Sequence, residues 1–152
     1  MNRERKVLAA NRQARHDYHI LEREEAGIEL VGCEVKSVRE GRVSLRDAFV
    51  EFVAGQAYLV GCNISRYGNA GYANPDPLRR RKLLLHKGEI LRLAGKVAEK
   101  GLTVVPLAML LDGNWIKVEI ALARGKQQHD RRETLRRREL DRDMELALKE
   151  RR

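Results

Sequence analysis

The hydrophobic positions of this 152-residue chain recur mostly at the spacing of two that a half-buried β-strand requires. The pattern is clearest near the end of the apolar part, where residues 103–111 and 115–123 flank the turn signal Asp112-Gly113. The apolar side chains that alternate in the second of these segments are Ile116, Val118, Ile120 and Leu122. An antiparallel hairpin is therefore predicted here.

Shorter segments upstream carry the same alternation. Residues 49–53 and 57–60 flank an Ala-Gly-Gln turn at 54–56, which predicts a second hairpin. Another strand is predicted to begin at residues 43–45, and one more over residues 28–32, after an Ala-Gly pair that we expect to be a break.

Two segments have helical spacing instead. Residues 34–40 place their valines on one face and are followed by Gly41, which predicts a short helix with a glycine cap. A long loop rich in Gly, Asn and Pro is expected over residues 65–77. Beyond it, apolar residues at helical spacing predict a helix from about residue 83 that Gly101 ends.

These elements predict a mainly β fold, a small closed β-barrel of the oligonucleotide-binding type with a few peripheral helices. The chain divides into a basic N-terminal arm at residues 1–16, the barrel domain at 17–123 and a basic C-terminal tail at 124–152.

The net charge of +9 is concentrated in the two ends of the chain. Residues 124–152 contain 11 basic and 7 acidic side chains, and residues 1–16 contain 5 basic side chains and one acidic. Basic arms on a nearly neutral body usually have a polyanionic partner, with nucleic acid favoured over acidic protein or lipid headgroups.

The apolar runs are short. The longest, residues 104–111, contains Pro106 and falls well below the roughly 20 residues that span a bilayer. We therefore expect a cytoplasmic protein with no membrane partner. Cys33 and Cys62 lack a C-x-x-C spacing, so reduced thiols are expected, with a disulfide or a metal site as the alternatives.

The sequence contains no motif typical of an enzyme active site. His16, His19, His86 and His129 are scattered, and no phosphate-cradling glycine motif occurs. The prediction is a binding protein, not an enzyme, without a catalytic site, a metal or a cofactor.

Two basic segments are candidates for phosphate contacts. Four adjacent cations at residues 79–82 oppose the macrodipole of the predicted helix, so we interpret them as a surface-exposed phosphate-binding cluster; the alternative is a solubilising run. The N-terminal arm interleaves arginines with Asn11, His16 and Tyr18, a mixture suited to structured RNA, unless it is a frayed terminus.

The tail has two parts. Residues 125–133 contain no apolar side chain, which predicts a flexible segment in isolation. The distal part has an apolar stripe at helical spacing and could fold against a partner, or have no role. The residues of the stripe are Leu135, Leu140, Met144 and Leu148.

Five strings occur in order across about 120 residues: NRQARHDYHI, EREEAGIELVGCEVKSVREG, RRRKLLLHKGEI, TVVPLAMLL and ARGKQQHDRRE. Together they resemble small protein B (SmpB), the SsrA-binding protein family of bacteria. The resemblance implies an oligonucleotide-binding barrel that binds the tRNA-like domain of transfer-messenger RNA (tmRNA). It also implies delivery of that RNA to stalled ribosomes for trans-translation.

The resemblance assigns RNA contacts residue by residue, and the basic cluster adds Arg79. The expected tmRNA-binding residues are Asn11, His16, Glu25, Glu34, Lys36, Arg79, Arg81, Lys82, Leu84 and His86. A glutamate repels phosphate, so Glu25 and Glu34 are expected to bind base edges or 2′-hydroxyls, or to orient a neighbouring arginine. Leu84 is expected to support the shape of the surface.

The resemblance also implies that the tail, disordered when free, enters the decoding centre and the empty message channel of the ribosome, against small-subunit RNA, and becomes helical there. The residues expected to carry this contact are Gly125, Lys126, His129, Asp130, Arg131 and Arg132. One departure is Pro75, which stands where the family usually has His. The free protein is expected to be monomeric. The alternatives are another barrel-type translation factor or ribosomal protein, and an RNA-processing enzyme.

Overall fold

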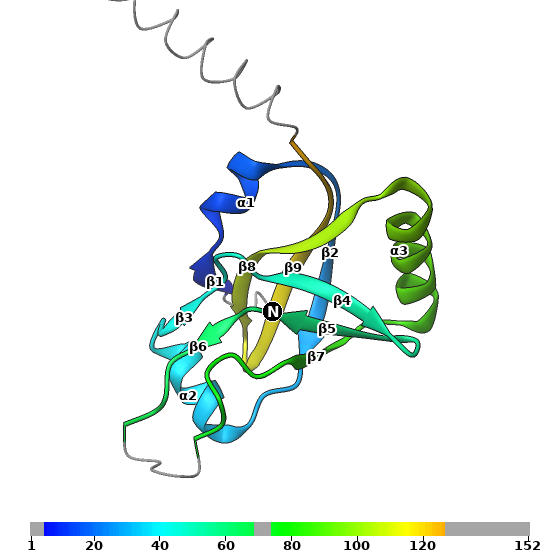
Figure 1. Ribbon diagram of the computed structural model, residues 1–152. Coiled ribbons are helices and arrows are strands. Elements are labelled where there is room, and N and C mark those ends of the chain that lie inside the picture. Colours follow the sequence, from blue (N-terminus) through cyan, green and yellow to red (C-terminus); the bar gives the residue numbers. More distant parts are fainter. Residues whose placement is uncertain (1–4, 69–73, 127–152) are drawn as a thin grey trace, which may run out of the picture.

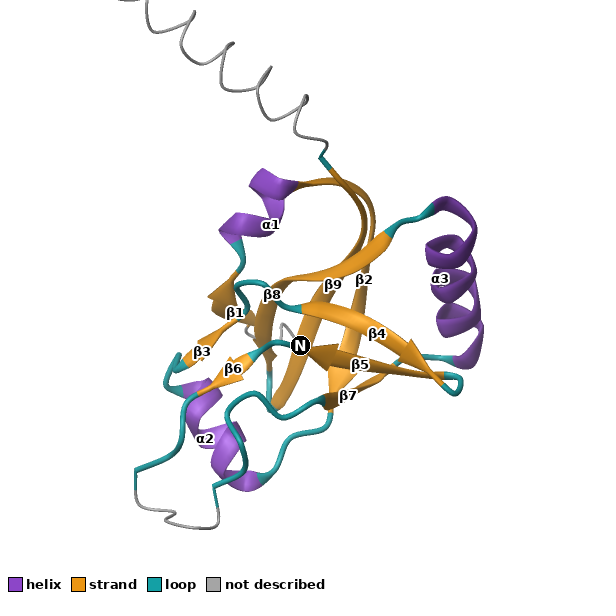
Figure 2. Cartoon of the chain, in the orientation of Figure 1, coloured by secondary structure: helices purple, strands orange, loops and turns teal. Residues whose placement is uncertain are grey.

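The computed structural model describes residues 5–68 and 74–126. Helices lie on the outside of a strongly curved sheet (Figures 1 and 2). In chain order the elements are β1 (Arg5–Ala10), α1 (Arg12–Asp17), β2 (Tyr18–Ile28), α2 (Gly32–Arg39), β3 (Val43–Ser44), β4 (Phe49–Val53), β5 (Gln56–Val60), β6 (Asn63–Ile64), β7 (Arg81–Leu84), α3 (Lys87–Lys100), β8 (Thr103–Asp112) and β9 (Trp115–Gly125).

The sheet closes on itself. Its order is β8–β4–β5–β7–β2–β9, and β9 pairs back with β8, with every pairing antiparallel. β8 is long enough to hold two partners along its other edge, β4 near its beginning and β1 near its end. Closure leaves few strand edges open to a neighbouring chain. The predicted mainly β barrel with peripheral helices is confirmed.

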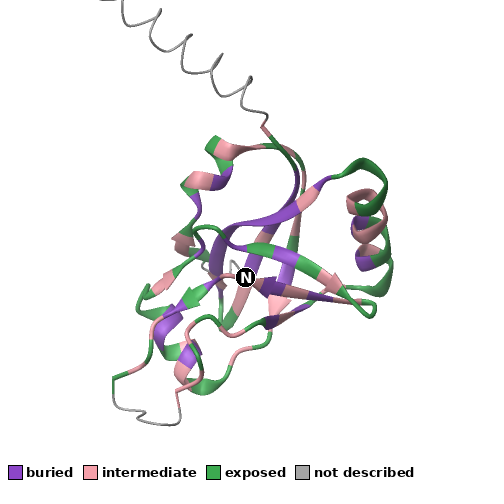
Figure 3. Cartoon of the chain, viewed as in Figure 1, coloured by how far each residue is buried: buried purple, intermediate pink, exposed green. Residues whose placement is uncertain are grey.

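Two buried clusters explain why β8 is apolar on both faces (Figure 3). The main core fills the barrel and receives side chains from α2 and α3; its members include Val38, Leu59, Leu83, Leu93, Val104, Met109, Val118, Ile120 and Leu122. A smaller cluster lies between α1 and the outer side of β8 and β9, and consists of Ala14, Val105, Leu107, Ala121 and Ala123. α1 therefore shields apolar side chains of β8 and β9 that would otherwise face water.

Both predicted hairpins are confirmed, as β4–β5 and β8–β9. The first turns through Ala54 and Gly55, both with positive φ, 50° and 75°, as a tight hairpin turn requires. The short helix predicted over residues 34–40 is also present, as α2. The strand expected from residue 43 is short, because β3 has only two residues.

The helix predicted from residue 83 was placed too early. Residues 81–84 form β7, which pairs with β5 and β2, and α3 begins at Lys87. The three consecutive leucines fit helical spacing, but pairing on both edges of the segment decides for a strand. The stop at Gly101 is confirmed, since this residue has φ +62° and ends α3 in the left-handed conformation.

The strand predicted to begin after the Ala-Gly pair begins ten residues earlier and contains the pair near its end. β2 runs from Tyr18 through Gly27 to Ile28. Gly27 stands opposite Leu84, and a Cβ at this glycine would lie 3.2 Å from the Leu84 Cβ. The glycine therefore serves close cross-strand packing and does not interrupt the strand.

α3 carries a charged contact to β2 beside its apolar face. Arg92 donates to both Glu22 and Glu24, and the Lys96 Nζ lies 2.5 Å from a Glu22 oxygen. These contacts hold the Glu22 pKa below its usual value, with the hydrogen bonds from Lys96 and Arg92 as the main causes. Over the two described ranges, no helix has the length and apolar content needed to cross a membrane.

The expected basic arm is not separate from the barrel over its described part, residues 5–16. β1 pairs with β8, and Asn11 joins β1 to α1. The buried Asn11 amide donates to the carbonyls of Leu45 (3.2 Å) and Pro106 (2.9 Å), and its oxygen accepts from the Ala14 N–H (3.2 Å). One side chain thus caps the helix and satisfies two buried carbonyls.

We expect Asn11→Ala to lower the free energy of unfolding by about 2–3 kcal/mol, because it removes a helix cap and leaves two carbonyls without this donor. Urea unfolding measures the change. Asn63→Ala is the matched control: Asn63 is exposed, and a loss of at most about 0.5 kcal/mol is expected. Equal losses in both variants would contradict this role.

Candidate nucleic-acid interface

A buried carboxylate organises the region where α2 meets β7. Glu34 lies in the first turn of α2, where its Oε1 accepts the Val31 N–H at 3.1 Å. Its two oxygens also receive Arg79 Nη2 at 2.5 Å and Arg81 Nε at 2.7 Å. Glu34 is only 2% exposed, so the two guanidinium groups replace the water that it has lost. We call these three charged residues the Glu34 network.

Arg81 extends the Glu34 network toward the long loop. Its Nη1 donates to the Cys62 carbonyl at 2.7 Å, and its Nη2 donates to the Pro77 carbonyl at 3.0 Å. The Pro77 carbonyl also accepts the Ile64 N–H at 2.9 Å. Arg81 therefore connects α2 to the residue just before β6 and to Pro77 in the segment between β6 and β7.

The interpretation of residues 79–82 as a surface-exposed cluster is wrong for Arg81, which has no exposed surface. Alternation along β7 turns Arg81 inward together with Leu83 and leaves Lys82 and Leu84 outside. The side chains of Arg79 and Arg80 are 36% and 49% exposed, so the cluster keeps part of its outward charge.

Burial and ion pairing act on the Glu34 pKa in opposite directions. Burial raises it, but the hydrogen bonds from Arg79, the Val31 N–H and Arg81 outweigh burial and hold the pKa below its ordinary value. Cys62, whose carbonyl accepts from Arg81, has a buried thiol, and burial raises its pKa to about 11. The thiol therefore stays protonated at neutral pH.

Outside the Glu34 network, α2 and the neck of the long loop present a cation and a ring. Lys36 is exposed, and its Nζ lies 5.3 Å from the centroid of the Tyr67 ring. The Asn74 side chain exchanges two 2.8 Å hydrogen bonds with the Tyr67 backbone and closes the neck. Pro75, which stands where the resemblance leads us to expect His, directly follows Asn74.

A second group of expected residues lies where β2, β7 and α3 meet. A pocket here is lined by Glu25, Leu84, Leu85, His86 and Glu89. Leu84 is 50% exposed and packs on Gly27. The Glu25 carboxylate pairs with Arg5 and lies 4.0 Å from Lys117 Nζ, so this acid sits between two cations.

Three further expected residues lie at the other end of the barrel, beside α1 (Figure 1). The exposed His16 ring places Nδ1 3.0 Å from the Asp17 carboxylate. Gly125 ends β9 opposite Tyr18, and the Lys126 N–H donates to the Asp17 carbonyl at 2.9 Å. The remaining tail residues with expected roles, His129, Asp130, Arg131 and Arg132, lie outside the described residues, as does the expected distal helix.

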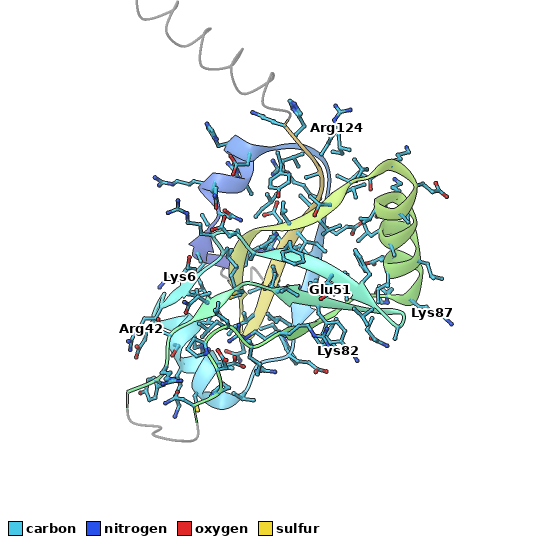
Figure 4. All side chains as sticks on the ribbon, in the orientation of Figure 1. Lys6, Arg42, Glu51, Lys82, Lys87 and Arg124 are labelled. Carbon is cyan, nitrogen blue, oxygen red and sulfur yellow. The ribbon has the colours of Figure 1, made fainter. Side chains whose placement is uncertain are left out.

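Cations gather on several sides of the barrel, as the side chains in Figure 4 show. The sequence predicted no contact of Arg5 or Lys117 with Glu25, because only the pairing of β1 with β8 and of β2 with β9 brings them together. Within the residues that the structure describes, no group of three or more His, Cys, Asp or Glu side chains is placed to hold a metal ion.

The fold and these surfaces define a class: small β-barrel proteins of the oligonucleotide-binding type with arginines, lysines and tyrosine rings on the outside. A family model described as "SmpB protein" matches residues 8–150. This chain therefore belongs to the SmpB family.

Individual relatives match over nearly the whole chain. An SsrA-binding protein of Microcystis aeruginosa is 54% identical over 145 residues, covering 95% of this chain and 94% of the relative. Another, from Gloeothece citriformis, is 53% identical over 149 residues, covering 97% and 96%. A solved structure described as "tmRNA-SmpB: a journey to the center of the bacterial ribosome" contains a chain that matches with TM-score 0.68 and 50% identity, covering 85% of this chain and 94% of that one.

We expect Glu34→Gln to lower the free energy of unfolding at neutral pH by about 3 kcal/mol, because Arg81 stays buried without its counter-charge. The folded-state pKa of Glu34 is lowered, so its stabilisation is present above the unfolded pKa and is lost as the pH falls through the folded value. The difference in the free energy of unfolding between wild type and variant should therefore be constant above about pH 5 and should shrink at lower pH.

Urea unfolding at several pH values measures this difference. Glu40→Gln, at the C-cap of α2, is the matched control. Glu40 is exposed and its carboxylate lies 3.9 Å from Arg42, so a change within about 0.5 kcal/mol is expected. A Glu34→Gln loss that persisted at acid pH would contradict the ion-pair origin of the effect.

Proposed function

We propose that this protein is an RNA-binding adaptor that binds the tRNA-like domain of tmRNA and delivers it to stalled ribosomes for trans-translation. The observation that carries the proposal is the match at above 50% identity, over nearly the full length, to proteins named SsrA-binding protein. The likeness to a chain from a structure described with tmRNA, SmpB and the ribosome supports the same partners.

The barrel supplies the surface for the RNA in this proposal. Lys36, Lys82 and the exposed part of Arg79 offer charge to phosphates. Leu84 and His86 offer an apolar contact and a ring beside Glu25, which can accept from base edges or 2′-hydroxyls. His16 is an exposed contact at the other end of the barrel.

Three of the expected RNA-binding residues act by positioning in this proposal. Asn11, Glu34 and Arg81 are at most 6% exposed, so they have little surface to offer to a ligand. Glu34 instead holds Arg79 by a hydrogen bond of 2.5 Å, which supports the predicted role of orienting a neighbouring arginine. Their loss would weaken RNA binding through the shape of the surface.

The tail carries the ribosomal part of the proposal. The residues proposed to contact the decoding centre are Gly125, Lys126, His129, Asp130, Arg131 and Arg132, with the distal stripe becoming helical in the message channel. The hydrogen bond from Lys126 to Asp17 supports a root that is fixed on the barrel. The protein acts by binding, without catalysis, in the cytoplasm where ribosomes work.

We expect Lys36→Gln and Lys82→Gln each to weaken binding of the tRNA-like domain and to reduce the slope of log K against log salt by about 0.7–0.9. Filter binding over a salt series measures both quantities. Lys100→Gln, at the far end of α3, is the matched control and should leave the slope unchanged. Equal slopes in all three variants would contradict the placement of the RNA.

We expect a chain that ends after Lys126 to fold and to bind the tRNA-like domain like the full protein, but to lose tagging of stalled nascent chains. This cut keeps β9 and the Lys126–Asp17 hydrogen bond, so the barrel stays whole. Thermal unfolding, RNA binding and a reconstituted tagging reaction provide the three readouts.

Full tagging by the truncated chain would refute the role of the tail. Ribosomal RNA fragments at matched salt serve as competitors, because a generic rRNA-binding protein would prefer them or show no preference.

A further inference from the structure

The register of β4, β5 and β7 brings three side chains from distant parts of the sequence into one row. Tyr58 in β5 lies directly opposite Glu51 in β4 and directly opposite Lys82 in β7. Glu51 and Lys82 are labelled on this side of the barrel in Figure 4. Residues directly opposite on paired strands place their side chains on the same face of the sheet.

This row faces outward. The neighbours of Tyr58 along the strand, Ala57 and Leu59, are fully buried in the main core, so alternation turns the tyrosine ring away from it. The neighbours of Lys82, Arg81 and Leu83, are likewise at most 1% exposed. The ring and the lysine therefore lie on the outer surface, and no loop or helix is inserted between their strands.

Arg80 completes the arrangement. Its guanidinium carbon lies 4.3 Å from the centroid of the Tyr58 ring, which is stacking distance. Its Nη1 is 3.7 Å from a Glu51 oxygen, so an ion pair holds the group over the ring. The Arg80 side chain is nevertheless 49% exposed, which leaves it accessible from outside. We call Tyr58, Arg80 and Lys82 the stacking platform.

The surroundings of the stacking platform favour a flat, negatively charged partner. Exposed apolar side chains lie on β4 and β7 on either side of it: Phe49 (42%), Val53 (38%) and Leu84 (50%). Glu51 is matched by Arg80, whereas Lys82 makes no ion pair with any residue that the structure describes. Apolar contacts and a guanidinium suit the faces of bases, and the spare cation suits a phosphate.

We propose that the stacking platform binds an unpaired nucleotide of RNA, with the base on the Arg80 guanidinium above Tyr58 and the adjoining phosphate on Lys82. A paired base inside a helix has no free face, so the ligand is a single-stranded or looped segment. This inference deepens the proposed function and rests on it. Lys82 belongs both to the stacking platform and to the proposed tmRNA surface, and Leu84 of that surface lies on the same strand, β7.

Stacking and plain charge are separated by two conservative substitutions. Arg80→Lys keeps the cation and loses the flat group, and Tyr58→Phe keeps the ring and loses the hydroxyl. We expect Arg80→Lys and Tyr58→Leu to weaken binding of a short single-stranded oligoribonucleotide by about fivefold or more, and Tyr58→Phe to bind like wild type. The slope against salt should stay unchanged in Arg80→Lys, since the charge remains.

Fluorescence anisotropy with an end-labelled oligonucleotide measures these affinities, and thermal unfolding checks that each variant is folded. Arg46→Lys is the matched control, because Arg46 is exposed and lies outside the stacking platform; wild-type affinity is expected. Wild-type affinity in Arg80→Lys would overturn the stacking role. So would preferential binding of an acidic peptide over the oligonucleotide.

Binding of the tRNA-like domain by the wild-type protein is measured in parallel. Suppose that the wild type does not prefer the tRNA-like domain over ribosomal RNA fragments, while Arg80→Lys and Tyr58→Leu still bind the oligonucleotide more weakly. The proposed function is then wrong, and the role of the stacking platform is supported. If the wild type prefers this RNA and the variants bind the oligonucleotide like wild type, only the stacking platform is wrong.

Discussion

The fold around the candidate interface depends on one buried ion pair, Glu34 with Arg81. It joins α2 to β7, and the other N–H groups of Arg81 donate to the carbonyls of Cys62, just before β6, and of Pro77, at the end of the long loop. A buried charge without its partner is costly, so neither residue can change alone. Glu34 also accepts a hydrogen bond from the partly exposed Arg79. The same carboxylate therefore pairs with a buried arginine and positions a positive charge at the surface.

Closure of the barrel explains how a small domain can present several surfaces. Each strand of the closed sheet has an inner face in the main core and an outer face that is free unless a helix covers it. α1 covers the outer side of β8 and β9. α3 instead lies against the inner face of β2, where Glu22 and Glu24 stand opposite Leu122 and Ile120 of the main core. The outer side of β4, β5 and β7 carries charged and aromatic groups. Because side chains alternate along each strand, the residues that enter the core determine which of their neighbours lie on the outer surface.

The sequence predicted the barrel, both hairpins and α2, because alternation and turn residues are local signals. It placed the start of α3 too early, since the leucines before Lys87 fit helical spacing and only pairing with β5 and β2 decides for a strand. It also read Arg81 as exposed, because no local signal distinguishes a buried arginine from its neighbours. The partners of Glu25 and Tyr58 depend on strand register, which a single sequence does not reveal.

β2 has a consequence for the geometry of the molecule as a whole. It begins at Tyr18, opposite Gly125 at the root of the tail, and reaches Gly27, opposite Leu84, at the other end of the barrel. At about 3.3 Å per residue, the length along the strand between these two points is roughly 30 Å. Because β2 is paired on one edge with β9 for nearly its whole length, it fixes the separation between the root of the tail and the Leu84 end of the barrel, and so between the two contacts proposed there.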